Sequence, residues 1–346
     1  MWCECASFRG NSDIILSSFA QNLFIMRNHL LTLLFLGISI ALGAQTWQIL
    51  PTQNACSARH ENAMAAIGNR VYLLGGRGMR PVDELNLSTN TWKALETSPL
   101  EMNHFQALSY KGEIYVLGAF TGKYPHEMPI EHIYIFNPKT NAWRKGPQIP
   151  KDRLRGAAGT FIRNNKFYIV CGIQDGHWDG FVGWFDEYDP ATNTWRKLPD
   201  APHARDHISV AVVKDKLVVA GGRTSWAKTN QVLQLTLNEV DIYDFKTNTW
   251  TTLDASKNIP TPRAGATAIA YKGKVLIIGG ESSAHVEAHN EVEAFDVQKN
   301  TWEKWPNLHT TRHGTQVVKA KGKLYIGAGS KNRGGGPELN TVEVLH

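Results

Sequence analysis

Four histidines lie within two residues of one repeated position and have the chemistry for metal binding or proton transfer. His60 and His313 directly follow a repeated arginine, whereas His104 and His207 lie one position further along their copies. Imidazoles that converge can hold a transition metal or act as general bases. No two of the four form a close-spaced His-x-x-x-His motif with an acid. We therefore predict pore-lining residues, with His60 and His313 as ligand contacts, His104 and His207 as candidate catalytic groups, and neither a metal nor a cofactor.

An arginine recurs at a constant distance from a glycine-containing pair in five of six copies of a repeat. Arg263, for example, lies sixteen residues before Gly279. Guanidinium groups bind carboxylates bidentately, so converging arginines favour an acidic sugar or an acidic peptide as ligand. A residue shared by five copies is more easily explained by a scaffold role, in which it donates hydrogen bonds to loop carbonyls. Both interpretations stay open for the predicted ligand-binding arginines, which are Arg59, Arg155, Arg205, Arg263 and Arg312.

Two tryptophans and two aspartates in long loops fall outside the repeated positions. Trp178 and Trp226 offer a flat apolar face to a sugar ring or a peptide side chain, and we predict both as ligand contacts. A loop that folds over its own small apolar cluster would explain them equally well. Asp175 and Asp179 flank His177 and are further candidates for acid and base roles.

The elements that must position these residues come from six copies of one cassette, which is clearest from Arg263 to Trp302. The first segment of each copy is rich in small residues. The second is an apolar run such as 71–74, as expected for a strand buried on both faces. Residue pairs that tolerate the positive φ of tight hairpins join the two segments. These pairs are Gly68-Asn69, Lys111-Gly112, Asn164-Asn165, Lys272-Gly273 and Lys321-Gly322.

The repeat, with copies about fifty residues apart, a glycine pair and a downstream tryptophan, resembles the kelch-repeat family. The resemblance covers residues 46–346. It rests on Gly75-Gly76, Gly221-Gly222 and Gly279-Gly280, and on Trp92, Trp143, Trp195, Trp250 and Trp302. The other copies carry the altered pairs Gly118-Ala119, Cys171-Gly172 and Ala328-Gly329. The resemblance implies an all-β fold, a kelch-type β-propeller with four strands in each blade.

The two ends of the repeat region predict how the ring closes. The sixth copy ends after its third strand, before any tryptophan, whereas Thr46-Trp47 begins a fourth strand with no strand before it. Joining them would pair an otherwise exposed sheet edge. We therefore predict a six-bladed propeller whose ring is closed by the N-terminal strand (46–50), which completes the last blade.

The ligand-binding face follows from the order of the strands. The loops after the second strand and the loops that enter the next blade share one face of a propeller. The loops after the glycine pairs vary most in length and content, and binding residues are commonly carried on loops held by a rigid scaffold. We therefore place the ligand on this face, around the central channel.

Composition and charge limit the class of partner. The 346 residues carry a net charge of +6, with a sequence pI near 9.0. Lysines and arginines are scattered between acidic residues, whereas nucleic-acid binding calls for a basic stripe or a known module. We expect no nucleic-acid partner and a monomer in which residues 45–346 form a single domain.

The N-terminal region has the pattern of a secretory signal. A charged start at Met26 precedes the apolar run 30–42 and the small residues Gly43 and Ala44. We predict a signal peptide over 26–44, preceded by an extension (1–25) without a structural role. The apolar run is too short to span a bilayer comfortably, and Gln45 offers no cysteine for lipid attachment. A soluble periplasmic or secreted product follows, without membrane insertion after cleavage.

Cleavage after Ala44 would leave two cysteines, Cys56 and Cys171, which belong to the first and third copies. Sequence gives no reason for their Cα atoms to approach within bridging distance. We expect two free thiols.

The kelch-type fold serves several functions, so the fold alone does not choose among them. A binding module for a glycan or a partner protein, with an anionic ligand favoured, requires only the variable loops and no catalytic groups. We predict such a binding protein and no enzyme. The resemblance also implies an alternative, a mutarotase or epimerase acting on an acidic sugar such as sialic acid. A copper-dependent galactose-oxidase-like enzyme is favoured least, because its set of two tyrosines, two histidines and a cross-linked cysteine cannot be assigned.

Overall fold

A computed structural model describes Met1 and residues 45–346 of the chain. The predicted signal peptide (26–44) and upstream extension (1–25) lie outside the described residues, apart from Met1. Residues 45–346 form one compact unit that contains strands and three short 3-10 turns. These turns are η1 (Lys151–Arg153), η2 (Ala227–Thr229) and η3 (Ala255–Lys257). The described residues contain no helix long and apolar enough to cross a membrane.

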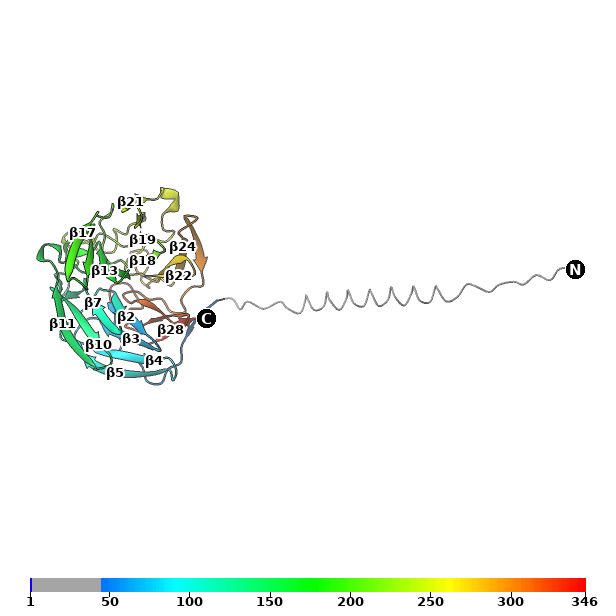
Figure 1. Cartoon of the computed structure of the whole chain (residues 1–346), viewed down its shortest axis with the longest axis horizontal. Coiled ribbons are helices and arrows are strands. Elements are labelled where there is room, and N and C mark those ends of the chain that lie inside the picture. The colour runs from blue at the N-terminus through cyan, green and yellow to red at the C-terminus, as the bar shows by residue number, and fades with distance from the viewer. Residues whose placement is uncertain (2–44) are drawn as a thin grey trace. The chain divides into compact units, whose positions relative to one another are not determined.

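Six four-stranded antiparallel sheets surround a central axis, and each sheet is a propeller blade (Figure 1). Blades 1 to 3 consist, from the axis outward, of β2 (Asn62–Ile67), β3 (Arg70–Gly75), β4 (Pro81–Asn86) and β5 (Thr91–Thr97); β6 (Ala107–Tyr110), β7 (Glu113–Val116), β10 (His132–Asn137) and β11 (Ala142–Gln148); and β12 (Gly159–Arg163), β13 (Lys166–Val170), β16 (Phe185–Asp189) and β17 (Thr194–Leu198). Blades 4 to 6 consist of β18 (Ala211–Val213), β19 (Lys216–Ala220), β20 (Val240–Asp244) and β21 (Thr249–Thr252); β22 (Thr267–Tyr271), β23 (Lys274–Ile278), β24 (Val292–Asp296) and β25 (Thr301–Trp305); and β26 (Val317–Ala320), β27 (Lys323–Gly327), β28 (Val342–Leu345) and β1 (Trp47–Ile49). The prediction of a six-bladed all-β propeller is confirmed.

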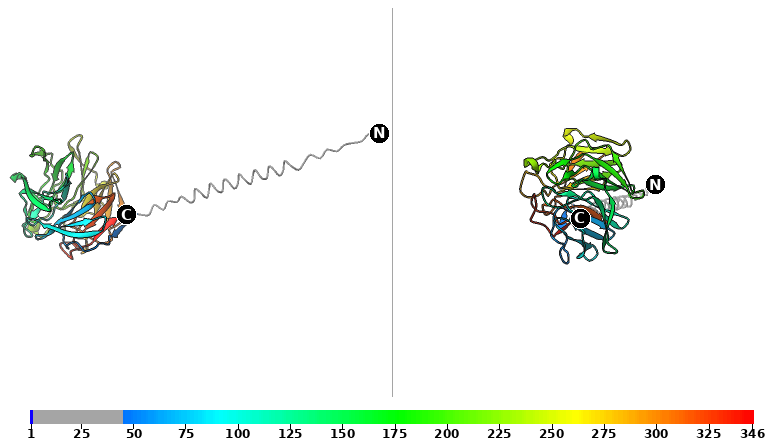
Figure 2. Two further views of the ribbon diagram at one scale, coloured as in Figure 1. Left: turned by 60° about the horizontal axis from the view of Figure 1, so that its bottom comes forward. Right: turned by 90° about the vertical axis from the view of Figure 1, so that its left-hand side faces the viewer.

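The N-terminal strand completes the last blade, as predicted. β1 pairs antiparallel with β28, with Trp47 opposite Leu345 and Ile49 opposite Glu343. Trp47 is buried against Leu324 and Leu345 of blade 6 and Leu276 of blade 5. The two ends of the propeller therefore meet in a single sheet, and Figure 2 shows the closed ring from two further directions.

The hydrophobic core lies between neighbouring blades. Tyr72 and Leu74 of β3, for example, share a cluster with Ile114 and Val116 of β7 in the next blade. Both faces of each second strand are covered in this way, which explains its continuous apolar sequence. The tryptophans of the outer strands pack against an aromatic residue of the third strand, with ring centroids 4.8–5.1 Å apart, in the pairs Phe136–Trp143, Tyr188–Trp195, Tyr243–Trp250 and Phe295–Trp302.

The glycine pairs make the close turn that follows the second strand. Gly221 has φ of +73°, and a Cβ atom there would lie 2.7 Å from the carbonyl oxygen of Arg263. Blades 3 and 6 make the same turn with Cys171 and Ala328, at φ of 58° and 57°. Cys171 and Cys56 are both buried and unpaired, as expected. The altered pairs therefore keep the backbone geometry of the repeat.

Two small two-stranded sheets lie in the loops beyond the altered pairs of blades 2 and 3. They are formed by β8 (Phe120–Thr121) with β9 (Met128–Pro129), and by β14 (Ile173–Asp175) with β15 (Asp179–Phe181). β9 and β14 pack against each other. These two predicted binding loops are thus ordered hairpins that hold their side chains in place.

Candidate functional site

A ring of six residues, one from each blade, surrounds the channel. Each lies two residues after the repeated arginine position and has a left-handed backbone, with φ between 50° and 62°. The ring consists of Glu61, His104, Ala157, His207, Gly265 and Gly314. Only two of the six are glycines, so the fold holds four side-chain-bearing residues in a conformation that L-residues rarely adopt. Strained backbone of this kind is concentrated at functional sites.

Main-chain hydrogen bonds between blades hold this ring. The amide of His104 donates to the carbonyl of Glu61 (3.1 Å), and the amide of Ala157 donates to that of His104 (3.0 Å). The amide of Gly265 donates likewise to the carbonyl of His207 (2.8 Å). The ring position is therefore a main-chain joint between blades, which explains why its backbone repeats while its side chains differ.

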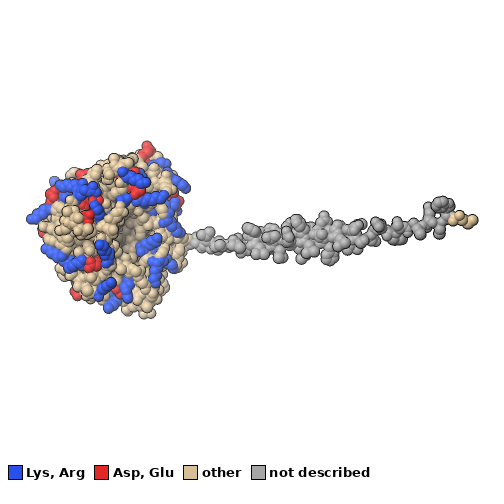
Figure 3. Space-filling view, viewed as in Figure 1, with Lys and Arg blue, Asp and Glu red and all other residues tan. Residues whose placement is uncertain are grey.

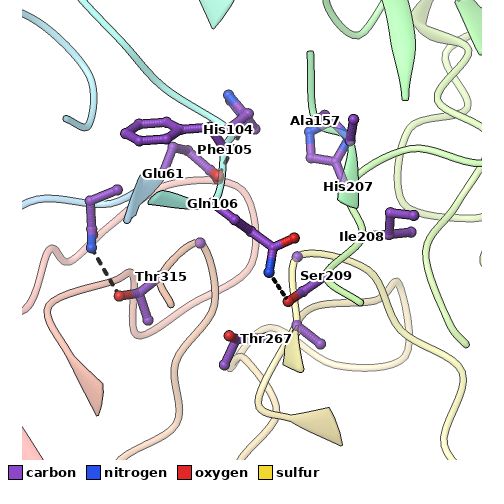
Figure 4. Close-up of a pocket in the computed structure, with 15 residues that line it drawn as sticks. Glu61, His104, Phe105, Gln106, Ala157, His207, Ile208, Ser209, Thr267 and Thr315 are labelled. Carbon is purple, nitrogen blue, oxygen red and sulfur yellow. Dashed lines mark hydrogen bonds and ion pairs between the residues drawn. The ribbon is translucent and has the colours of Figure 1, made fainter. Parts of the chain in front are cut away.

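Two adjoining cavities meet at Glu61 and His104. The larger has a volume of about 720 Å³ and opens among the loops that follow the second strands, and every blade contributes to it. The smaller, of about 40 Å³, lies along the channel beside the ring. In Figure 4, His104 and His207 both line this smaller cavity, with ring centroids 4.7 Å apart, and the side chain of Gln106 reaches across to Ser209. A ligand in the larger cavity would rest on the ring.

Three buried histidines converge beside the ring. One ring nitrogen from each of His104, His177 and His207 lies within 4.8 Å of the other two. The Nε2 atoms of His177 and His207 are 3.0 Å apart. All three side chains are at most 7% exposed. His104 and His177 also line the larger cavity, so the cluster lies in its wall.

The second ring nitrogen of each histidine has a partner of its own. Nδ1 of His177 lies 3.0 Å from the Glu127 carboxylate, and Nδ1 of His207 contacts the carboxylate of Asp206. Nδ1 of His104 lies 2.6 Å from Oδ1 of Asn103. Burial lowers the pKa of His104 and of His207 well below the usual value for histidine.

A second buried cluster joins blades 1, 5 and 6. Nε2 of His313 lies 3.5 Å from a carboxylate oxygen of Glu61 and 3.3 Å from one of Glu281. Burial opposes a charged imidazole, but Glu281 and Glu61 raise the pKa of His313. Burial likewise opposes ionisation of the two carboxylates. Nearby His104 and His313 nevertheless lower the pKa of Glu61, and His313 and Arg223 lower the pKa of Glu281. The cluster therefore places a buried histidine between two buried carboxylates.

Two protein-family models match this chain. The family model described as the Attractin/LZTR1 beta-propeller matches residues 35–280, and the Kelch motif model matches residues 262–309. The chain belongs to the kelch-type β-propeller family. The kelch fold is compatible with a role in binding.

Individual kelch relatives are distant. Kelch-like protein terF from Aspergillus terreus is 26% identical over 309 residues, which cover 82% of this chain and 64% of the fungal protein. Kelch-like protein 38 from Rattus norvegicus is 25% identical over 81% of this chain and 46% of its own length. The chain thus spans less than two thirds of the length of these two relatives. A solved structure titled "Structure of YjhT" matches with a TM-score of 0.70 and 18% identity, covering 86% of this chain and all of that chain, which shows the kelch fold.

The repeated kelch arginines lie inside their own blades. All five are at most 2% exposed. Arg263 donates to the carbonyls of Gly279 (2.6 Å) and Ile277 (3.0 Å) and pairs with Glu293 (2.6 Å). The other arginines make the same kind of contacts, to the carbonyls of Gly75, Cys171, Gly221 and Ala328 and to the carboxylates of Asp83, Asp186, Asp241 and Glu343. Of the two interpretations left open, these contacts favour the scaffold role.

The predicted loop residues lie outside the larger cavity. Trp178 stacks near His126, with ring centroids 4.7 Å apart, and Trp226 packs against Phe181 at 5.8 Å. Asp175 contacts His126 (3.1 Å), whereas Asp179 accepts a hydrogen bond from the amide of Gly180 (2.6 Å). None of the four lines the cavity. These contacts agree with the alternative of loops folded over their own small clusters.

The predicted histidines divide between the two clusters. His104 and His207 come together with His177, whereas His313 lies between Glu61 and Glu281. His60 lines the larger cavity and contacts Glu338 (2.7 Å). Sequence analysis identifies His177 only as the residue between two aspartates, and it does not identify Glu61, Glu127 or Tyr124. One usable signal was present: a side-chain amide or carboxylate directly precedes both ring histidines, in Asn103-His104 and Asp206-His207.

Proposed function

We propose that this chain is an extracytoplasmic binding protein that holds a small acidic glycan in the larger cavity of its loop face. The single observation that carries the proposal is the cavity itself. Its volume of about 720 Å³ falls within the range of about 300–1,000 Å³ for small-ligand pockets. A partner protein would contact the flat loop rim more than this concave interior.

The cavity lining suits a ligand with hydroxyl groups and a ring face. Glu61, Glu101 and Glu281 offer carboxylate acceptors, whereas Tyr124 stands at the rim with 58% of its surface exposed. A sugar presents both an apolar ring face, which packs on an aromatic ring, and hydroxyls that donate to carboxylates. Val232 and Leu233 add apolar surface to the lining. The lining thus supports a carbohydrate ligand.

One cation of the lining is available for a negative charge. Arg77 is paired with Glu127 (2.6 Å) and Arg223 with Glu281 (2.5 Å). Lys123 lines the same cavity and makes no ion pair among the described residues. A carboxylate on the sugar would meet this lysine at the rim. Figure 3 shows lysines and arginines spread over one face of the molecule, with fewer acidic residues among them.

A glycan array probed with the full chain tests this function. We expect capture of acidic oligosaccharides, and about a tenfold lower affinity for Tyr124→Ala or Lys123→Gln. Lys139→Gln is the matched control, because Lys139 is an exposed lysine of the same blade outside this cavity. An array without any captured glycan, or unchanged capture by both cavity variants, would contradict the proposal. Capture of neutral and acidic glycans alike would remove the role of Lys123.

A mutarotase is the second candidate, and one contact favours it. Nε2 of His104 lies 3.3 Å from the Glu61 carboxylate, and both residues line the cavity. An adjacent base and acid could exchange protons at the anomeric hydroxyl and the ring oxygen of a sugar. Exchange spectroscopy by proton NMR on sialic acid should then show faster interconversion of the anomers with the chain, and not with Glu61→Gln. Interconversion no faster than in buffer would leave binding without catalysis.

A further inference from the structure

The three-histidine cluster has a geometry that its own protons do not satisfy. The amide orientation of Asn103 is fixed, because its Nδ2 donates to Glu101 (2.7 Å) and its Oδ1 therefore faces His104. Nδ1 of His104 must then carry the proton. Its Nε2, which lies 3.3 Å from the carboxylate of Glu61, is then the ring nitrogen left to bind a ligand.

The other two histidines face each other through ring nitrogens that carry no proton. Nδ1 of His177 donates to Glu127, and Nδ1 of His207 donates to Asp206, so both Nε2 atoms carry lone pairs. These lone pairs face each other across 3.0 Å. A proton between them would bridge only this one pair and would leave His104 as it is. A cation that accepts several lone pairs at once satisfies all three rings.

We propose that His104, His177 and His207 bind a divalent transition metal ion of the late first row, with Zn²⁺ as its representative. Imidazole nitrogens suit Zn²⁺, Cu²⁺, Ni²⁺ and Fe²⁺, whereas Mg²⁺ and Ca²⁺ prefer oxygen ligands. Two nitrogens bound to one Zn²⁺ at about 2.0–2.1 Å lie about 3.3 Å apart in a tetrahedral site. The observed separation of 3.0 Å requires only a small outward shift.

The surroundings of the three rings are those of metal ligands. Histidines that bind metals almost always donate the other ring N–H to a carboxylate, a carbonyl or water, which fixes the tautomer. Glu127, Asp206 and Asn103 fill that role for the three histidines. Glu127 is itself fixed by Arg77 (2.6 Å), and Asp206 accepts hydrogen bonds from the amide (2.8 Å) and hydroxyl (2.6 Å) of Ser225. The three histidines and the side chains that orient them are therefore all in place.

The site is reachable and leaves one coordination position open. His104 and His177 line the larger cavity, which provides an entry path for the ion. Three protein ligands with a fourth position facing a cavity are the arrangement of zinc sites that bind water or substrate. The cluster contains histidines and no cysteine, so a cross-linked cysteine–tyrosine centre of the galactose-oxidase type is not part of it. The proposal concerns metal binding alone and does not depend on glycan capture.

Metal analysis of the full chain, produced without a polyhistidine tag, tests the site. After dialysis against Zn²⁺ and gel filtration, we expect one equivalent of zinc per chain, and visible ligand-field bands when Co²⁺ replaces it. A triple variant, H104N/H177N/H207N, should retain less than a tenth of an equivalent. His289→Gln is the matched control, because His289 is also buried and stacks on a second histidine, His285, at 4.6 Å. It should bind zinc like the wild type.

A conservative variant separates ligation from folding. Glu127→Gln keeps the size of the side chain but weakens its hydrogen bond to His177. We expect it to lower the affinity for Zn²⁺ about 10- to 100-fold, as removal of such supporting groups does elsewhere. Zinc should also raise the melting temperature of the wild type and not that of the triple variant. Substoichiometric zinc in the wild type, or equal zinc in the wild type and a folded triple variant, would overturn the proposal.

Discussion

Five of the six blades neutralise a buried arginine with a carboxylate of the same blade, and these pairs govern how single residues contribute to stability. Arg263 and Glu293 are each at most 3% exposed in their side chains. A buried pair adds little net stability compared with apolar residues, but removing one partner leaves an uncompensated charge. The loss of one arginine should therefore cost far more than its net contribution.

Arg263→Ala is expected to lower the free energy of unfolding by about 3–5 kcal/mol. The substitution leaves Glu293 buried without a counter-charge and removes the hydrogen bonds to the carbonyls of Gly279 and Ile277. Urea unfolding followed by tryptophan fluorescence measures the change. Lys197→Ala breaks an exposed pair with Asp152 and should cost less than about 1 kcal/mol. Equal losses in the two variants would mean that burial of the pair does not matter.

Glu187 should make stability depend on pH in the acid range. Burial opposes its ionisation, but hydrogen bonds from Arg196, Lys166 and Tyr168 lower the pKa of Glu187 to about 2. A carboxylate with a lowered folded-state pKa stabilises the fold above its unfolded pKa, and this stabilisation is lost as pH falls through the folded value. The stability difference between wild type and Glu187→Gln should be constant above about pH 5 and shrink between about pH 4.5 and pH 2. Thermal melts at several pH values measure it, and a difference that persists unchanged at pH 2 would contradict the assignment.

At the scale of elements, the repeat made the strands predictable and concealed the site. Hairpin tips such as Lys272-Gly273 and outer tryptophans such as Trp302 could be aligned because every blade imposes the same backbone demand. The histidine cluster has no such repeat: His104 and His207 come from equivalent positions of two blades, but His177 comes from the turn between β14 and β15. Its approach depends on the packing of two loop hairpins, which spacing along the chain does not reveal. The repeated arginines were easy to find, but their constant spacing was compatible with both a scaffold and a binding site.

The turn after the second strand of blade 4 should tolerate a side chain poorly at Gly221, because the next blade packs closely against it. In Gly221→Ala, the new Cβ would lie 2.7 Å from the Arg263 carbonyl oxygen of the neighbouring blade, in addition to the cost of a positive φ. Gly68→Ala meets the same backbone cost at φ of +59°, but nothing lies within 4 Å of its Cβ. We expect a loss of about 1 kcal/mol for Gly68→Ala and about 1–3 kcal/mol more for Gly221→Ala, measured by urea unfolding. Equal losses would show that the turn adjusts its backbone without disturbing the contact between Gly221 and the next blade.

At the scale of the whole molecule, closure converts six similar sheets into one cooperative unit. Inner strands contact their neighbours around the ring, and the main-chain hydrogen bonds of the ring residues connect the same blades. Blade 6 is the one sheet assembled from both ends of residues 45–346. An extracytoplasmic location and a monomeric state remain predictions. N-terminal sequencing checks the location, because a processed chain should begin at Gln45. Closure itself can be tested directly through β1.

Trp47 should carry most of the stability of closure. It is 5% exposed, packs between blades 5 and 6, and faces Leu345 across the β1–β28 pair, whereas Gln48 beside it is exposed. Trp47→Ala is expected to lower the free energy of unfolding by about 3–5 kcal/mol, and Gln48→Ala by less than about 0.5 kcal/mol. Both changes can be measured by urea unfolding.

Removal of residues 45–50 tests the same joint without a point substitution. It exposes the edge of β28 along its whole length, and an unpaired edge recruits strands from other chains. Size-exclusion chromatography should then show oligomers, and a synthetic peptide of residues 45–51 should restore the size and melting temperature of the intact chain. A truncated chain that stays monomeric and melts with the wild type would show that the ring is held by its blade contacts alone. The peptide distinguishes loss of closure from general misfolding, because only an otherwise folded ring can accept the missing strand.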